Sequence, residues 1–353
     1  MNRIPEIIAA LPKYDIDAML LTGAVNRRWA TGFPSSAGVL VVTPTESVFV
    51  IDSRYVENAK AQITGARVIE IETNKPYTEI INKVLEENKV QTLGFEDSVM
   101  TQAAYAEYQK KLKAELIPAG ELMDILRQSK NEMELSCIKK AQEITDKAFA
   151  QAIERITPGM TEKELAAEIV YHLLKNGGEK TSFDPIVISG SRSSVPHGTP
   201  GDYPLSGFVV IDFGAVYRGY CSDMTRTIAV GTVTDEMRRV YDTVLEAQLA
   251  GCRAAKAGIV GRDLDQVARS VIEAAGYGAY FKHGLGHSLG LEVHESLRAA
   301  PTENRVLPAG TVVSIEPGIY LPGQFGVRIE DLVYLTETGA ENLTKSPKEL
   351  IVL

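Results

Sequence analysis

Short apolar runs alternate with amphipathic segments over the first 125 residues of the chain. Runs of about four to eight β-branched and aliphatic residues bounded by turn formers are typical of strands, and apolar residues at three- and four-residue steps indicate helices. The strands are predicted at Ala18–Thr22, Gly38–Val42, Ser47–Ile51, Val68–Ile71 and Thr92–Phe95, and the helices at Thr78–Lys89 and Gln102–Lys113. This alternation predicts a small α/β domain over residues 1–125.

The pattern changes from Glu132 onward, where one helical period continues without a break. The apolar positions of this stripe are Ile138, Ala141, Ile144, Ala148, Ala152 and Ile156. A stripe of this length predicts a long helix with one face against a core. We therefore place a second domain at residues 126–353, with the boundary in the region of residues 120–132.

The second domain contains an internal repeat. The segment Glu154–Gly177 matches Arg253–Gly276 at a shift of 99 residues, with glycine opposite glycine in the turn and at the end. Each copy has the pattern of a helix, a turn with a glycine, and a second helix that ends at a C-capping glycine. Two similar halves predict an α/β (α+β) domain with an internal pseudo-two-fold relation.

Four acidic residues occupy corresponding places in the two copies. Asp212 ends one apolar run and Asp223 lies inside the next, so that an antiparallel hairpin brings them together. In the second copy Glu316 follows an apolar run and Glu330 lies inside the run Gly326–Leu335. A carboxylate in apolar surroundings costs several kcal/mol unless it is paired or bound to a cation. Four acids on apolar strands therefore predict bound cations.

Three of the five histidines, His283, His287 and His294, lie in the segment HGLGHSLGLEVHE, between the second helix pair and Glu316. Four carboxylates and one imidazole form a natural ligand set for two divalent cations, because the negative charge of the acids offsets the positive charge of the metals. Two such cations also acidify bound water. The sequence therefore predicts a dinuclear hydrolase site.

Composition excludes several other classes of protein. The 353 residues include 37 basic and 46 acidic side chains, for a net charge of -9, and no basic block of the kind that binds nucleic acid. The apolar stretches are shorter than the ~18 residues of a membrane span, and the first residues lack the pattern of a secretory signal. Cys137, Cys221 and Cys252 are odd in number and widely spaced, as reduced thiols are. We expect a cytoplasmic protein without a membrane or nucleic-acid partner.

Five motifs together resemble the pita-bread metallopeptidases, and within them the Xaa-Pro peptidases prolidase and aminopeptidase P. They are SSVPHGTP, VIDFG followed by SDMTRT, GLGHSLGLEVHE, IEPGIY and FGVRIED. The resemblance covers nearly the whole chain, because Tyr55 and the segment Thr31–Phe33 also resemble the smaller domain of the family. It implies a creatinase-like α/β domain at residues 1–125 and a pita-bread catalytic domain at residues 126–353.

The resemblance implies a role for each of five metal ligands. Asp212 would chelate one metal, Asp223 and Glu330 would bridge both, and His287 and Glu316 would complete the other. Thr225 lies two residues from Asp223, so we expect its hydroxyl to orient that carboxylate.

Further residues are implied to act on the substrate. His197 and His294 would hold the substrate and stabilise charge on its carbonyl oxygen, and Glu316 would carry the proton to the leaving nitrogen. Arg328 would lie at the substrate, on the strand face that Glu330 shares.

The implied reaction is hydrolysis of the Xaa-Pro bond in small peptides with proline at the second position. The resemblance implies a homodimer with two divalent ions in each chain, and oxygen-rich ligation suits Mn²⁺, with Co²⁺ or Zn²⁺ as alternatives. Ser288 and Leu297 depart from the glycine and proline that the family often has at these places. Both departures concern the rim of the substrate pocket.

Several functions stay open at this point. A prolidase and an aminopeptidase P differ in whether a carboxylate follows the proline, and the residues do not separate them. A methionine aminopeptidase would resemble only the second domain, whereas a creatine hydrolase would share both domains. A non-catalytic binding module with this fold is also compatible with the pattern.

Overall fold

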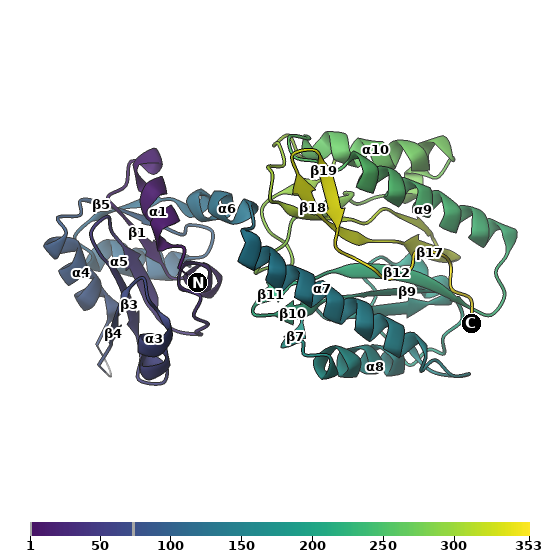
Figure 1. The fold of residues 1–353 in the computed structure, drawn as a ribbon, viewed down its shortest axis with the longest axis horizontal. Coiled ribbons are helices and arrows are strands. Elements are labelled where there is room, and N and C mark those ends of the chain that lie inside the picture. The colour runs from purple at the N-terminus through teal and green to yellow at the C-terminus, as the bar shows by residue number, and fades with distance from the viewer. Residues whose placement is uncertain (1, 73–74) are drawn as a thin grey trace. The chain divides into compact units, whose positions relative to one another are not determined.

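The computed structural model describes residues 2–72 and 75–353. The chain divides into two compact units, of which the first ends at Arg127 and the second begins at Gln128. Helix α6 (Gly120–Gln128) spans the boundary expected between residues 125 and 126 (Figure 1). The fold class is confirmed as a mixed α/β chain with a smaller N-terminal unit. Among the described residues, no helix has the length and apolar character needed to cross a bilayer.

The N-terminal unit is built on one six-stranded sheet with the order β4-β3-β2-β1-β5-β6. Its strands are β1 (Ala18–Leu21), β2 (Val39–Val42), β3 (Ser47–Ile51), β4 (Arg67–Glu70), β5 (Thr92–Phe95) and β6 (Glu115–Pro118). Its helices are α1 (Ile4–Ala10), α2 (Ala24–Thr31), α3 (Val56–Gln62), α4 (Tyr77–Glu87), α5 (Gln102–Lys111) and α6, with the 3₁₀ turn η1 (Leu11–Tyr14).

The predicted elements of this unit agree with the structure to within two residues at each end. Strand β6 was not predicted. It lies at the edge of the sheet, is only partly buried and ends at Pro118, so its sequence lacks the continuous apolar run of the central strands.

Four helices frame the C-terminal unit: α7 (Glu132–Ile153), α8 (Glu162–Lys175), α9 (Asp235–Ala254) and α10 (Gly261–Ala274). A capping box between Asn131 and Glu134 begins α7 at the predicted residue. The helix ends at Ile153, so the prediction that Ile156 continues its stripe is wrong. Pro158 restricts the residue before it and the chain turns there instead.

The strands of this unit form several short antiparallel ladders. They are β7 (Lys180–Thr181), β8 (Ile186–Ser189), β9 (Gly207–Phe213), β10 (Ala215–Tyr217), β11 (Tyr220–Cys221), β12 (Met224–Val230), β13 (Gly286–His287), β14 (Arg298–Ala299), β15 (Val312–Ile315), β16 (Gly318–Leu321), β17 (Phe325–Arg328), β18 (Asp331–Thr336) and β19 (Gly339–Asn342). The 3₁₀ turns η2 (Gly190–Ser194) and η3 (Gly278–Tyr280) lie between them.

The strands lie between the two helix pairs, with α7 and α8 on one side and α9 and α10 on the other (Figure 1). One apolar core joins α7 and α8 to β8, β9 and β12. A second core joins α9 and α10 mainly to β15, β16, β17 and β18. The two halves therefore bury their strands in the same way.

The helical repeat is present in the structure. Gly159 and Gly258, in the two interhelical turns, have φ angles of 85° and 84°, and Gly177 and Gly276, after the second helices, have φ angles of 99° and 85°. After both second helices, the backbone N–H groups of the glycine and of the next residue bond back to the last turn in the same pattern. This pattern is the Schellman cap, in which the left-handed position favours glycine.

The strands correct two details of the prediction. Asp223 lies just before β12 and Glu330 lies between β17 and β18, so neither is inside a strand. In both halves the chain changes partner at this point. Strand β11 pairs with β10 and β12 with β9, whereas β17 pairs with β16 and β18 with β15. Each acid occupies the junction between two ladders of its half.

Candidate metal centre

The strand junctions bring the four predicted acids to one place. Asp212 pairs with Thr225 in the β9–β12 ladder, and Glu316 directly follows β15. The N–H of Glu330 donates to the carbonyl of Thr225 at 3.0 Å, which joins the two halves of the repeat. His287 reaches the same place from the short strand β13. All five of these side chains line one cavity of about 510 Å³.

The buried carboxylates of this cavity are incompletely paired. Asp212 is 8% exposed, Asp223 5% and Glu330 1%. Within residues 2–72 and 75–353, one oxygen of each of these three acids, Oδ1 or Oε1, has no hydrogen-bond partner. A buried, unpaired carboxylate oxygen is costly, so these acids favour either a bound cation or a proton.

The distances among the donor atoms suit a cation between them. His287 Nε2 lies 3.6 Å from Asp223 Oδ2 and 3.3 Å from Glu316 Oε1. One donor atom each of Asp223, His287 and Glu330 lie within 4.8 Å of one another. Two ligands that each lie about 2.1 Å from one metal ion are separated by roughly 3–3.5 Å. The arrangement therefore fits divalent cations, and its donor set is rich in oxygen.

Burial and mutual repulsion perturb the ionisation of these groups. Burial raises the pKa of Asp223 well above its usual value, and the charges of Asp212 and Glu316 add to the effect. The pKa of Glu330 is raised in the same way, by burial and then by Asp223. Burial raises the pKa of Glu316 to about 7 and lowers the pKa of His287 to about 3. A cation removes the penalty on the ionised acids, and the neutral imidazole is the form that binds metals.

Hydroxyl groups hold two of the carboxylates. Thr225 Oγ1 donates to Glu330 Oε2 at 2.8 Å, and Ser314 Oγ donates to Glu316 Oε1 at 2.9 Å. The expectation that Thr225 orients Asp223 is therefore wrong. Thr225 lies on β12 opposite the junction at Glu330, so its hydroxyl reaches across the repeat instead of along its own strand.

Arg328 is buried and makes its ion pair with an acid of the other half. Its Nη2 lies 2.6 Å from Asp212 Oδ2, and its Nε donates to Thr225 Oγ1 at 3.1 Å. The guanidinium therefore pairs with Asp212, although the alternation along the strand places Arg328 on the face of Glu330. It lies in the lining of the same cavity.

The two histidines expected at the substrate also line the cavity. His294 packs its ring edge to face on His287, with 4.3 Å between the ring centroids. His197 lies in the chain after η2 and is exposed. Both residues therefore lie where the cavity meets solvent.

Three residues of the cavity region were given no functional role by the sequence. His283 Nε2 lies 3.1 Å from the hydroxyl of Tyr320, which accepts a hydrogen bond from Arg328 at 2.8 Å. Arg298 lines the cavity from β14 and is partly buried. The only signal for His283 was its place in the histidine segment, because its contact with Tyr320 depends on how β16 folds back.

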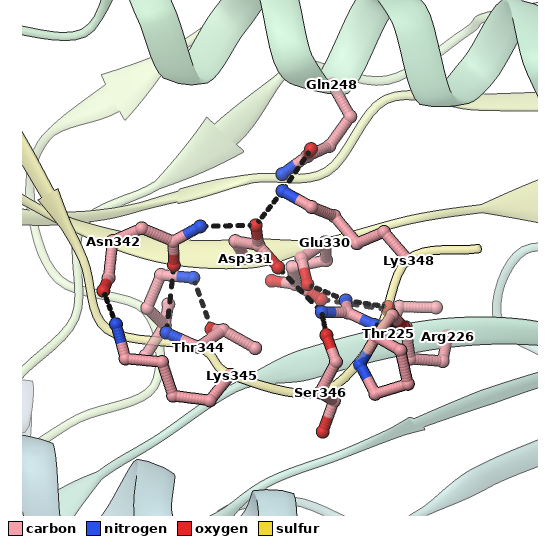
Figure 2. Close-up of polar contacts among 12 residues, drawn as sticks. Thr225, Arg226, Gln248, Glu330, Asp331, Asn342, Thr344, Lys345, Ser346 and Lys348 are labelled. Atoms are coloured by element: carbon pink, nitrogen blue, oxygen red, sulfur yellow. Dashed lines mark hydrogen bonds and ion pairs between the residues drawn. The ribbon is translucent and has the colours of Figure 1, made fainter.

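A buried ionic network lies behind Glu330 (Figure 2). Arg226 donates to the carbonyls of Thr225 and Glu330 at 2.9 and 2.5 Å, and its Nη2 pairs with Asp331 Oδ1 at 2.8 Å. Asp331 also accepts from Asn342 and from Lys348. Burial alone would raise the pKa of Asp331, but the charges of Arg226 and Lys348 outweigh it and lower the pKa. The network fixes the backbone on both sides of the junction.

Comparisons with known proteins identify the family of the chain. Residues 136–337 match metallopeptidase family M24, and residues 3–129 match the creatinase/prolidase N-terminal domain. The Xaa-Pro dipeptidase of Pyrococcus horikoshii is 40% identical over 99% of both chains. Among solved structures, an Xaa-Pro dipeptidase from Bacillus anthracis gives a TM-score of 0.96 with 41% identity over 99% of both chains. An X-Pro aminopeptidase from Thermotoga maritima gives 0.92 with 36% identity over 100% of both chains.

The fold and the family match define a metal-dependent hydrolase. The chain belongs to metallopeptidase family M24, with the creatinase/prolidase N-terminal domain in front of the catalytic domain. The predicted family and fold class are thereby confirmed.

Metal affinity is expected to fall with decreasing pH. Because the pKa of Glu316 is about 7 and those of Asp223 and Glu330 are raised, the metal-free site holds protons that a cation must displace. Between about pH 8 and about pH 5.5, we expect Mn²⁺ affinity to fall by about tenfold per pH unit for each linked proton. Calorimetric titration in buffers of different ionisation enthalpy measures this proton release. Glu316→Gln should reduce the slope by about one proton, and an affinity independent of pH would contradict the expectation.

The ionic network is expected to contribute strongly to stability. Asp331→Ala leaves the charge of Arg226 buried without its partner, so we expect the free energy of unfolding to fall by about 3–5 kcal/mol. The matched control is Glu341→Ala on β19, which removes an exposed ion pair with Lys139 and should cost less than about 1 kcal/mol. Urea unfolding followed by circular dichroism measures both. Equal losses in the two variants would contradict the assigned role.

Proposed function

We propose that the protein is a dinuclear Xaa-Pro dipeptidase. The observation that carries the proposal is the cavity lined by Asp212, Asp223, His287, Glu316 and Glu330, in which three buried carboxylate oxygens lack a partner among the described residues. In this proposal Asp212, Asp223, His287, Glu316 and Glu330 would hold two divalent ions, with Asp212 at one ion, His287 and Glu316 at the other, and Asp223 and Glu330 shared between them. Mn²⁺ suits the oxygen-rich set best, with Co²⁺ or Zn²⁺ as alternatives.

The bound metals would polarise the scissile carbonyl and supply an activated water. The side chains do the remaining work. The rings of His197 and His294 line the cavity and donate hydrogen bonds to the substrate carbonyl oxygen as charge develops there. Glu316, which lines the same cavity, would carry a proton to the leaving nitrogen. Arg328 holds Asp212 Oδ2 and acts as a positioning residue.

Arg298 favours a dipeptide over a longer substrate. Its guanidinium lines the cavity, and a free carboxylate after proline offers a partner for this charge. A relative and a structural neighbour that bear the name Xaa-Pro dipeptidase also support this choice. The X-Pro aminopeptidase from Thermotoga maritima keeps aminopeptidase P as the second candidate.

A methionine aminopeptidase and a non-catalytic module fit the structure less well. A methionine aminopeptidase does not account for the N-terminal domain matched at residues 3–129. A non-catalytic module has no need of four acids around one cavity, three of them buried. The N-terminal match does not separate a creatine hydrolase from a prolidase, because it names both. A homodimer and a cytoplasmic location stay predictions.

The activity is tested with Ala-Pro and with Ala-Pro amide, after removal of metal by a chelator and after addition of Mn²⁺. We expect hydrolysis only with metal, and a preference for Ala-Pro. Arg298→Met should lower kcat/KM for Ala-Pro by about 10- to 100-fold, the size of a lost charged hydrogen bond, with little effect on the amide. Arg262→Met, at an exposed arginine of α10, is the control.

Three results would contradict parts of this proposal. A preference for the amide or for longer Xaa-Pro peptides would indicate an aminopeptidase P. Full activity of the chelated protein would contradict the metal mechanism. Metal binding without hydrolysis of either peptide would indicate a binding module.

A further inference from the structure

His197 lies in a segment that has little regular structure of its own. The segment connects β8 to β9, and after η2 it contains neither helix nor strand. His197 itself is exposed. A ring that must meet a substrate carbonyl within hydrogen-bond distance needs a fixed backbone. The contacts of this segment show how the backbone is held.

The carboxylate of one buried residue accepts hydrogen bonds from the chain on both sides of His197. Glu162, the first residue of α8, is 0% exposed. Its Oε1 accepts from the N–H of Ser189 and its Oε2 from the N–H of Gly201, both at 2.8 Å. Twelve positions of sequence separate these two residues, and His197 lies between them. Glu162 therefore closes the segment into a loop.

Arg192 extends this clamp into the loop. Its Nε lies 3.2 Å from Glu162 Oε1, and its Nη2 donates to the carbonyl of Thr199 at 2.8 Å. The guanidinium also lies over the ring of Tyr203, 4.3 Å from the ring centroid. Arg192 thus balances the negative charge of Glu162 and also holds Thr199, two residues after His197.

The first turn of α8 adds backbone contacts. The N–H of Glu162 donates to the carbonyl of Tyr203 at 3.0 Å, and the N–H of Lys163 donates to that of Gly201 at 3.2 Å. The first N–H groups of a helix have no partner within the helix, so the loop satisfies them. The carboxylate and the helix start therefore hold the same stretch of chain.

The opposite side of the loop contacts the metal centre. Arg328 Nη1 donates to the carbonyl of Pro196 at 3.2 Å, and Arg328 Nη2 pairs with Asp212. Ser193 Oγ accepts from the N–H of Gly326 at 2.9 Å. The residue directly before His197 is thus tied to an arginine that touches a predicted metal ligand. Arg328 thus holds the middle of the loop from the side of the cavity, and Glu162 holds the loop at Ser189 and Gly201.

We propose that Glu162 is a positioning residue for His197. This inference rests on the proposed role of His197 at the substrate. Glu162→Gln leaves only one accepting oxygen at this position. The new amide N–H₂ group then faces a backbone N–H that now donates to the second carboxylate oxygen, and two donors cannot bond to each other. One end of the loop is then released, while the five predicted metal ligands keep all their contacts.

Glu162→Gln tests the proposal against Glu164→Gln as a matched control. Glu164 lies on the same turn of α8, is exposed, and caps the helix at Thr161 without reaching the loop. We expect Glu162→Gln to lower kcat/KM for the Xaa-Pro substrate by about 10- to 100-fold, as misplacement by about 1 Å can do, with metal content unchanged. Glu164→Gln should stay within about twofold of the unchanged protein. Equal effects of the two substitutions would overturn the proposal.

A double-mutant cycle with His197→Ala separates positioning from general destabilisation. If Glu162 acts through His197, Glu162→Gln has no further effect in the His197→Ala background. An effect of full size in that background would overturn the inference. The single variant His197→Ala tests the proposed role of His197 separately. If it leaves hydrolysis unchanged, that role is wrong.

Arg192→Lys carries the same test if Glu162→Gln does not fold. This substitution keeps a positive charge beside the buried carboxylate and removes the planar guanidinium that links Glu162 to Thr199. We expect a smaller loss of kcat/KM that also disappears in the His197→Ala background. A loss that persists there would overturn the proposal.

Discussion

The repulsion among carboxylates in a buried cavity is the constraint on which the catalytic unit depends. Asp212, Asp223 and Glu316 each raise the free energy of another ionised acid nearby, and burial removes the water that would screen them. Arg328 offsets part of this charge at Asp212, but other carboxylate oxygens remain unpaired among the described residues. Bound divalent cations compensate the rest, so folding around the site and metal binding are linked.

The repeat explains how a protein can place these acids together. Each half contributes two ladders, and the acids lie at or next to the points where the chain passes from one to the other. At such a junction the backbone is free to bond across the interface, as the N–H of Glu330 does with Thr225. The residues at these junctions interrupt the regular pairing of the strands, and the same residues connect the two halves of the repeat. The network of Arg226 and Asp331 then fixes this junction from behind.

Sequence patterns predicted the parts that local chemistry determines. Apolar runs located the strands of the N-terminal unit, and acids on such runs indicated a metal site, because both signals lie within a few residues. The five predicted ligands do line one cavity, although their individual roles stay predictions. Strand ends at Asp223 and Glu330 were misplaced because a change of pairing partner leaves no mark in an apolar run.

Contacts between distant strands were beyond the sequence for the same reason. The alternation of side chains along a strand predicts which of them share a face of that strand. It cannot predict that Arg328 pairs with Asp212, 116 residues away. Likewise, Thr225 bonds to Glu330 and His283 meets Tyr320 only because the two halves fold against each other. Positioning groups of this kind, and Glu162 with them, require the tertiary structure.

Crystallographic anomalous scattering at the manganese edge tests the central claim most directly. Protein reconstituted with Mn²⁺ should show two peaks per chain, both within the cavity lined by Asp212, Asp223, His287, Glu316 and Glu330, and Asp223→Ala should lose them. Absence of peaks at these side chains in a catalytically active, Mn²⁺-loaded crystal would contradict the account.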